Sequence, residues 1–262
     1  MNWNPTWICP ANDLGDPAAV FGTSFVFEKK ITHANLTITA MGVYEAKLNG
    51  RRVGQFVMAP GWTSYHKRLQ YQKYDITDLL TNGKNEIEVT VGKGWYRSPL
   101  PGWLGCAYQD ELRSRPCGLA AQITLTFEDG SSKILSTDES WKVSDGPVRF
   151  SEIYDGEIYD SAKTPLLDQP VTIFDGPTDT LILQQGEEVC EQERLAVKKV
   201  FVTPNGETVL DFGQNMTGYV ELFVNAKAGD CVDLSFAEVM DKEGNFYTEN
   251  YRGAKAQYHY IC

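Results

Sequence analysis

The stretch "ANLTITAMGVYEAKLNGRRVGQFVMA", Ala34–Ala59, decides the fold class of this sequence. Apolar and polar residues alternate on both sides of Asn49-Gly50, which is typical of half-buried β-strands joined by a tight hairpin turn. The same kind of turn pair returns at Asn82-Gly83, Asp129-Gly130 and Asn205-Gly206, each beside a run with strand periodicity. This recurrence predicts an all-β protein built from antiparallel sandwiches.

Helix signals are few, and the best one lies in "DITDLLTNG", Asp75–Gly83. Asp75 can cap the first turn of a helix there, and Gly83 can end it. We therefore expect a single short helical turn at this place and a low helix content in the rest of the chain.

The chain reads as two consecutive sets of strands. Between Ser151 and Gln192 the strand pattern weakens into a stretch with three prolines and many acids, which is typical of a linker. We predict a jelly-roll-like β-sandwich over residues 1–168 and a second β-sandwich over residues 169–262. The last predicted strand runs into Cys262 without a closing turn, so we expect the second sandwich to be truncated and the chain to be the front part of a longer protein.

Composition narrows the class of partner. The chain has 262 residues, 42% of them hydrophobic and 12% aromatic, which supports buried cores rather than disorder. Its formal net charge of −11 argues against nucleic acid and anionic membranes as partners. Because the sequence has neither a signal-peptide pattern nor an apolar run of about 18 residues, we expect a cytoplasmic location. The six cysteines form no C-x-x-C pair, so we expect no metal and no cofactor.

Catalytic motifs are weak in this sequence. The only histidines are His33, His66 and His259, and no Gly-x-Ser-x-Gly elbow or phosphate-binding loop accompanies them. The carboxylates of "YDGEIYD", Tyr154–Asp160, could serve as the acid and base of a glycosidase. Because they fall in the predicted linker with no rigid support, we interpret them as solvated acids and predict no catalytic residue.

The segment Gly92–Pro116, "GKGWYRSPLPGWLGCAYQDELRSRP", combines aromatic residues with arginine. Sugars offer C–H faces to aromatic rings and hydroxyl groups to polar side chains. Five residues of this segment are candidates for substrate contact: Trp95, Tyr96, Arg97, Trp103 and Tyr108. A long loop also needs a small core of its own, so a purely structural role for these aromatic residues stays open.

Three motifs together resemble the N-terminal region of bacterial α-L-rhamnosidases of glycoside hydrolase family 78. The first runs over Gly42–Arg97, from "GVYEAKLNG" to "GKGWYR", and the second is "IYDGEIYDSA", Ile153–Ala162. The third combines "LDFGQNMTGYVELFV", Leu210–Val224, with "SFAEVMDKEGNFYTENYRGAKAQYHY", Ser235–Tyr260. The resemblance implies a jelly-roll sandwich of the carbohydrate-binding kind, followed by a second sandwich.

Members of that family hydrolyse terminal non-reducing α-L-rhamnose with inversion, using carboxylates in an (α/α)6 barrel that follows the sandwiches. That barrel is absent from this sequence, so the resemblance implies a non-catalytic part that is inactive alone. Its implied partners are the barrel and a rhamnose-containing glycoside. Some relatives bind rhamnose and calcium on the first sandwich, but Lys93 stands here instead of an acid, so we predict no metal. A stand-alone lectin-like protein and a scaffold without sugar affinity remain alternatives.

Polar residues interrupt the strand pattern of Leu210–Val224. Six of them from this motif and the next could brace one another, because unpaired buried polar groups are costly: Asp211, Gln214, Asn215, Glu238, Asn250 and Arg252. We expect this set to dock the second sandwich onto the barrel. Sugar contact and an internal network that only holds the fold are the alternatives.

Overall fold

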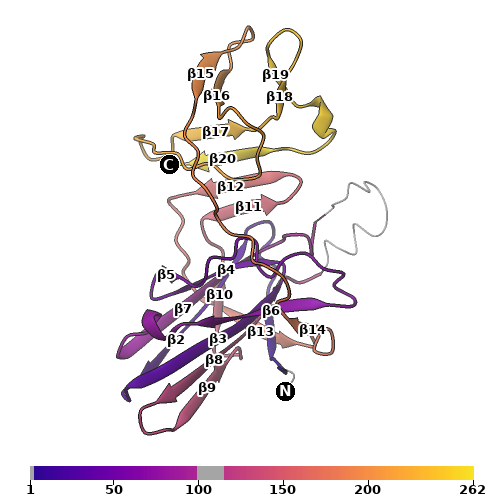
Figure 1. The fold of residues 1–262 in the computed structure, drawn as a ribbon. Helices are drawn as coiled ribbons and strands as arrows, with labels where there is room; N and C mark the ends of the chain where they lie inside the picture. Colours follow the sequence, from indigo (N-terminus) through magenta and orange to yellow (C-terminus); the bar gives the residue numbers. More distant parts are fainter. Residues whose placement is uncertain (1–2, 99–114) are drawn as a thin grey trace.

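A computed structural model describes residues 3–98 and 115–262, and it confirms an all-β protein. Figure 1 shows a large strand-rich body at the N-terminal end of the chain and a smaller one at the C-terminal end. The strands of the first part are β1 (Trp7–Pro10), β2 (Ala19–Phe27), β3 (Ile31–Met41), β4 (Val43–Leu48), β5 (Arg51–Arg52), β6 (Leu69–Asp75), β7 (Gly83–Gly92), β8 (Gly118–Phe127), β9 (Ser132–Ser136), β10 (Lys142–Ser144), β11 (Val148–Glu152), β12 (Gly156–Asp160), β13 (Gln169–Phe174) and β14 (Leu181–Leu183).

The later strands are shorter and are joined by longer irregular segments. They are β15 (Lys199–Val202), β16 (Thr208–Asp211), β17 (Cys231–Ser235), β18 (Val239–Met240), β19 (Phe246–Tyr247) and β20 (Gln257–Ile261). Two short 3-10 helices complete the described elements, η1 (Thr77–Leu79) and η2 (Glu249–Tyr251).

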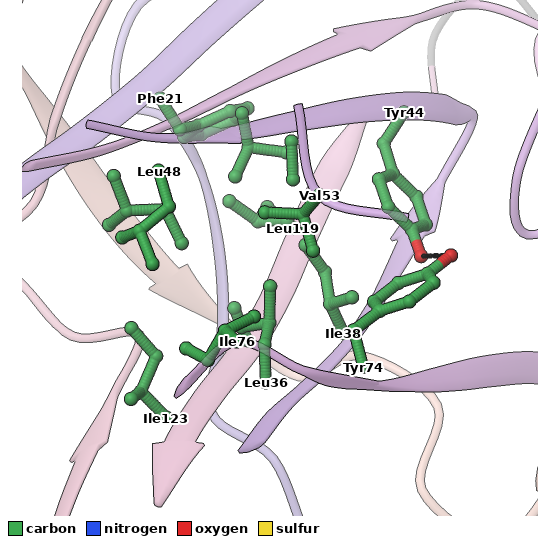
Figure 2. Packing of buried hydrophobic residues seen from close by; sticks show 14 of the residues in the cluster. Phe21, Leu36, Ile38, Tyr44, Leu48, Val53, Tyr74, Ile76, Leu119 and Ile123 are labelled. Carbon is green, nitrogen blue, oxygen red and sulfur yellow. Dashed lines mark hydrogen bonds between the residues drawn. The ribbon is translucent and has the colours of Figure 1, made fainter. Parts of the chain in front are cut away.

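The N-terminal sheet runs in the order β14-β6-β3-β8-β1-β13-β10-β2-β7-β4-β5, with β9 paired to β8. β13 pairs with β1 on one side and with β10 on the other, so it connects two halves that curl over each other. Both halves contribute to one apolar cluster, in which Phe21 of β2 and Leu48 of β4 face Leu36 and Ile38 of β3 (Figure 2). The alternation seen in the sequence thus fills the space between two layers.

The Asn49-Gly50 hairpin forms where it was predicted, between β4 and β5. Both residues have positive φ, 52° for Asn49 and 75° for Gly50, which is the conformation that a two-residue hairpin turn requires. The Asn49 amide also donates to Asn85 Oδ1 at 2.7 Å, and its Oδ1 accepts the Glu86 amide at 3.0 Å. This turn therefore ties β4 to the start of β7.

The predicted helical turn is present as η1, but it ends at Leu79 and not at Gly83, which begins β7. Asp75 Oδ1 accepts the backbone N–H of Thr77 at 2.9 Å and its hydroxyl at 2.6 Å, so Asp75 fixes the entry to the turn. These hydrogen bonds hold the pKa of Asp75 below its usual value.

A polar network lies inside this sandwich. The Tyr44 hydroxyl donates to Gln72 Oε1 at 2.8 Å and lies 3.3 Å from the Tyr74 hydroxyl, the contact dashed in Figure 2. Gln72 Nε2 in turn donates to Gln184 Oε1 at 2.8 Å, just after β14. The network fastens the segment that follows β14 to the N-terminal sheet, and burial raises the pKa of Tyr44 strongly.

The C-terminal sheet has the order β11-β12-β20-β17. β12 pairs with β20 in parallel, and β17 pairs with β20 in an antiparallel ladder. Figure 1 shows two hairpins beyond this sheet, β15–β16 and β18–β19. They touch through Asn245 Oδ1, which accepts the Asn205 amide at 3.1 Å.

Strand pairing crosses the predicted domain boundary in both directions. β13 and β14 follow residue 168 but belong to the N-terminal sheet, whereas β11 and β12 precede it and pair with the C-terminal sheet. The division at 168/169 stays a prediction. The interpretation of Ser151–Gln192 as a linker is wrong, because β12, β13 and β14 lie in it and find their partners far away in the sequence.

One predicted strand does not form. The run "GYVELFVNA", Gly218–Ala226, has strand periodicity, yet no strand covers it. Within the described residues no neighbouring strand pairs with it, and Phe223 is 89% exposed. Periodicity alone does not make a strand when the backbone lacks a partner.

Candidate functional site

A cavity of about 250 Å³ opens where β7 ends. One wall comes from the segment between β1 and β2, and the other comes from the turn after Gly92 and the residues just before β8. Its ionisable lining side chains are Asp13, Asp16, Lys93, Arg97, Arg115 and Cys117. A concave site with several convergent polar groups is the usual form of a small-molecule site.

An ion pair closes one side of this cavity. Lys93 Nζ lies 2.8 Å from Asp16 Oδ1 and 4.9 Å from the centroid of the Phe150 ring. The Lys93 side chain is only 16% exposed, so its ammonium group is held between a carboxylate and an aromatic face. The hydrogen bond and charge of Lys93 lower the pKa of Asp16.

Arg97 reaches the same cavity from the turn after β7. Its backbone N–H donates to the Lys93 carbonyl at 3.2 Å, which brings the two cations to one short turn. Burial raises the pKa of the Cys117 thiol, and the nearby Arg97 guanidinium opposes this rise in part. Cys117 is therefore a protonated, packed side chain at neutral pH rather than a nucleophile.

The two aromatic residues between Lys93 and Arg97 lie elsewhere. Trp95 stacks on Trp62 with the rings parallel to within 4° and their centroids 6.0 Å apart. Tyr96 is 7% exposed and packs edge-on against Tyr65. Arg115 lies over the Tyr96 ring, 5.7 Å from its centroid. Tyr96 thus serves packing, while Trp95 belongs to a surface pair.

The described residues among those predicted to contact sugar therefore lie in different places. Arg97 lines the cavity, Trp95 lies in the surface pair, and Tyr96 is buried. Trp103 and Tyr108 lie outside the described residues. Substrate contact by these residues stays a prediction.

The six polar residues predicted to brace one another in the C-terminal part are exposed to solvent. Asp211 Oδ1 accepts the Gly213 amide at 2.7 Å, which is a local turn. Within residues 3–98 and 115–262, the side chains of Asp211, Gln214, Asn215, Glu238, Asn250 and Arg252 make no hydrogen bond or ion pair with one another. Docking and an internal network both stay predictions for this set.

Apolar side chains gather on the same part of the chain. We name the following exposed residues the C-terminal apolar surface: Val197, Val200, Val202, Leu210, Met216, Tyr219, Leu222, Phe223, Val224, Val239 and Tyr260. The sequence did not predict this surface, because these residues lie in strand-like runs that indicated burial in a second core. Trp62 and Asp16 were also missed, since their roles depend on contacts with residues of the turn after β7.

The acidic motif "YDGEIYD" is part of a hairpin. Glu157 in β12 lies opposite Tyr258, and burial raises its pKa while a hydrogen bond with Ser151 lowers it in part. Asp160 Oδ1 accepts the Ala162 amide at 3.0 Å. In the part of the chain that the structure describes, no three His, Cys, Asp or Glu side chains gather as a metal site would require. Among these residues, no helix has the length and apolar character of a membrane span.

Two family models match this chain. The α-L-rhamnosidase N-terminal domain matches residues 29–193, and the bacterial α-L-rhamnosidase concanavalin-like domain matches residues 201–262. An α-L-rhamnosidase of Streptomyces avermitilis is 37% identical over 239 residues, which are 87% of this chain and 23% of that protein. One from Formosa agariphila is 34% identical over 250 residues, 91% of this chain and 26% of that protein. The chain thus spans about a quarter of these relatives.

Solved structures agree with the family models. The native α-L-rhamnosidase of Aspergillus terreus has a TM-score of 0.91 at 35% identity, over 98% of this chain and 31% of that one. The S. avermitilis enzyme complexed with L-rhamnose has a TM-score of 0.86 at 35% identity, over 94% of this chain and 25% of that one. The chain therefore belongs to the α-L-rhamnosidase family and corresponds to the N-terminal part of its members.

Proposed function

We propose that this chain supports the catalytic barrel of an inverting α-L-rhamnosidase, docking it through the C-terminal apolar surface. The observation that carries the proposal is the exposure of that surface, where Phe223 is 89% exposed and Val202 is 64% exposed. Large apolar side chains that stay exposed on a soluble protein are candidates for contact with another domain when they lie together. Among the described residues no strand pairs with Gly218–Ala226, so its backbone offers hydrogen-bonding groups to a neighbouring element.

A chimera tests this role. The chain would replace the matching N-terminal part of the S. avermitilis relative, and hydrolysis of an aryl α-L-rhamnoside would be measured for the chimera and for the chain alone. We expect turnover by the chimera and none by the chain alone, because the carboxylates belong to the barrel. Turnover by the chain alone would contradict the non-catalytic role.

A matched pair of variants tests the docking surface within the chimera. Phe223→Asp places a charge in the proposed contact and should lower the thermal midpoint and activity together. Ile134→Asp is the control, since Ile134 is 60% exposed on β9, in the N-terminal sheet. Equal midpoints for the two variants would reject the apolar surface as the docking site.

We propose further that the cavity after β7 contacts the rhamnose-containing substrate. Arg97, Lys93 and Asp16 give it both donors and acceptors, which suits a ring of hydroxyl groups. Calorimetric titration of the chain with L-rhamnose should give heat that Arg97→Ala weakens at least tenfold. Arg51→Ala on exposed β5 is the control. Equal heat from wild type and Arg97→Ala would remove the cavity from the proposal.

A further inference from the structure

Trp62 is a large aromatic side chain held at the surface. It is 59% exposed, although its ring stacks in parallel on Trp95. The indole behind it has intermediate burial, so the pair offers one open aromatic face to solvent. Neither indole lines the cavity after β7.

The turn that carries Trp62 is firmly built. The amides of Lys67 and Arg68 both donate to the Ser64 carbonyl, at 2.7 and 2.9 Å. Thr63 Oγ1 donates to the Arg68 carbonyl at 2.5 Å. Tyr65, next along the turn, packs edge-on against buried Tyr96 with centroids 5.4 Å apart. These hydrogen bonds order the backbone of the turn, and the stack on Trp95 orients the Trp62 ring before any ligand arrives, which lowers the entropy cost of binding.

We propose that Trp62 and Trp95 form an aromatic platform that binds the apolar face of a pyranose ring, as a second sugar-binding site apart from the cavity. This inference rests on the proposed role of the chain in a rhamnoside-hydrolysing enzyme. A pyranose places several C–H groups on one face, and these pack on the electron-rich face of an indole.

The surroundings of the platform supply groups for the sugar hydroxyls. Ser64, His66 and Lys67 are exposed in the same turn as Trp62. Hydroxyl, imidazole and ammonium groups donate or accept the hydrogen bonds that a sugar ring edge requires. An apolar ring face bordered by such groups is the pattern of a site that binds sugar rings from one side.

The size of the platform speaks against a protein partner. Stable protein interfaces bury about 800 Å² on each side around an apolar centre. Here the apolar part is a single exposed indole backed by a second one, and the exposed residues that follow in the turn are polar. One monosaccharide unit can cover the face of one indole, whereas a protein partner would contact mainly solvated charged side chains around it.

Nuclear magnetic resonance of the whole 262-residue chain tests the inference. The indole N–H signals of the 15N-labelled chain would be followed during titration with methyl α-L-rhamnopyranoside. We expect the Trp62 and Trp95 signals to shift together, with Trp62→Phe identifying the Trp62 signal by its loss. Phenylalanine keeps an aromatic face, so this variant should retain binding, as read from Trp95.

Trp62→Ala should weaken the binding seen at Trp95 at least tenfold. Val26→Ala is the matched control, because Val26 is also 59% exposed but lies on β2. Since Trp62 lies at the surface, the alanine variant should keep the amide spectrum of the folded chain. Unchanged affinity in Trp62→Ala would overturn the platform.

Two further outcomes separate this inference from the proposed function. Shifts confined to Lys93, Arg97 and their neighbours would overturn the platform and leave sugar contact at the cavity intact. The absence of any shift in a folded chain would overturn both sugar sites. Support of the barrel would still be decided by the chimera.

Discussion

The N-terminal sheet and the C-terminal part of this chain form the same kind of hairpin turn, but they differ in the burial of their apolar side chains. Both contain an Asn-Gly hairpin, Asn49-Gly50 in the first and Asn205-Gly206 in the second. In the described residues, every buried hydrophobic side chain lies between Trp7 and Val171. After Val171 the buried side chains of those residues are Thr203 and Asn245, both polar.

This difference shows that local sequence decides where hairpins form, whereas the packing of two sheet layers decides which side chains are buried. Turn chemistry and alternation form a hairpin at both Asn-Gly pairs, because they act over a few residues. Burial needs a second layer, which the N-terminal sheet gains by curling over itself at β13. The C-terminal part has amphipathic strands without such a layer among the described residues, so its apolar side chains stay in contact with solvent.

The largest difference between the two parts should appear when the same substitution, Phe to Ala, is made in each of them. Phe21→Ala should cost about 3 to 5 kcal/mol of unfolding free energy, because Phe21 is 0% exposed and its removal leaves a cavity. Phe223→Ala should change it by less than about 0.5 kcal/mol, because its ring is already in water. Urea unfolding followed by fluorescence gives both values. Similar losses would mean that the C-terminal part has its own core.

Removing one tyrosine hydroxyl group from each part compares a buried polar contact with an exposed one. Tyr44→Phe should destabilise the chain by about 1 to 3 kcal/mol, because it leaves buried Gln72 Oε1 without its donor. Tyr219→Phe removes a hydroxyl that bonds Glu191 at the surface, and water can replace it at a cost below about 0.5 kcal/mol. The same denaturant titrations measure the pair, and a larger loss for Tyr219→Phe would reverse our interpretation.

The smallest expected effect concerns two ion pairs. Lys93 lowers the pKa of Asp16, so the pair stabilises the chain above the unfolded pKa of Asp16, and this contribution is lost as the pH falls through the lower folded pKa. Asp16→Asn should therefore lower stability by about 0.3 to 1 kcal/mol at pH 7 and by little at pH 2.5.

The control is Glu221→Gln in the exposed Arg194–Glu221 pair, whose nitrogen–oxygen distance is also 2.8 Å. Its side chains are 76% and 58% exposed, so we expect no measurable change at either pH. Thermal unfolding at the two pH values decides between the pairs. A pH-independent loss in Asp16→Asn would show that its effect is steric rather than electrostatic.

Local features of the fold could be predicted from the sequence. The Asn49-Gly50 turn and the η1 turn entered by Asp75 depend on a few neighbouring residues, which the sequence displays directly. The pairing of β12 with β20 could not be predicted, because the parallel partner lies far along the chain. The prediction of a strand over Gly218–Ala226 was wrong, because this run has the pattern of a strand but no partner strand among the described residues.

The candidate site was predictable only in part. Arg97 was identified because its guanidinium group can bond sugar hydroxyl groups beside aromatic rings, and it does line the cavity. Asp16 and Trp62 gain their roles from Lys93 and Trp95, which are distant in sequence. The grouping of five aromatic and basic residues into one contact surface treated neighbours in sequence as neighbours in space, whereas Arg97 and Trp95 belong to different places.

The parallel pairing of β12 with β20 also constrains the order in which the chain folds during synthesis. About 100 residues separate the two strands, so the ladder closes a long loop and forms late. The N-terminal sheet can assemble as soon as β14 has left the ribosome, while the edge of β12 that later pairs with β20 stays open. Until β20 emerges, that edge is exposed to chaperones and to wrong pairing.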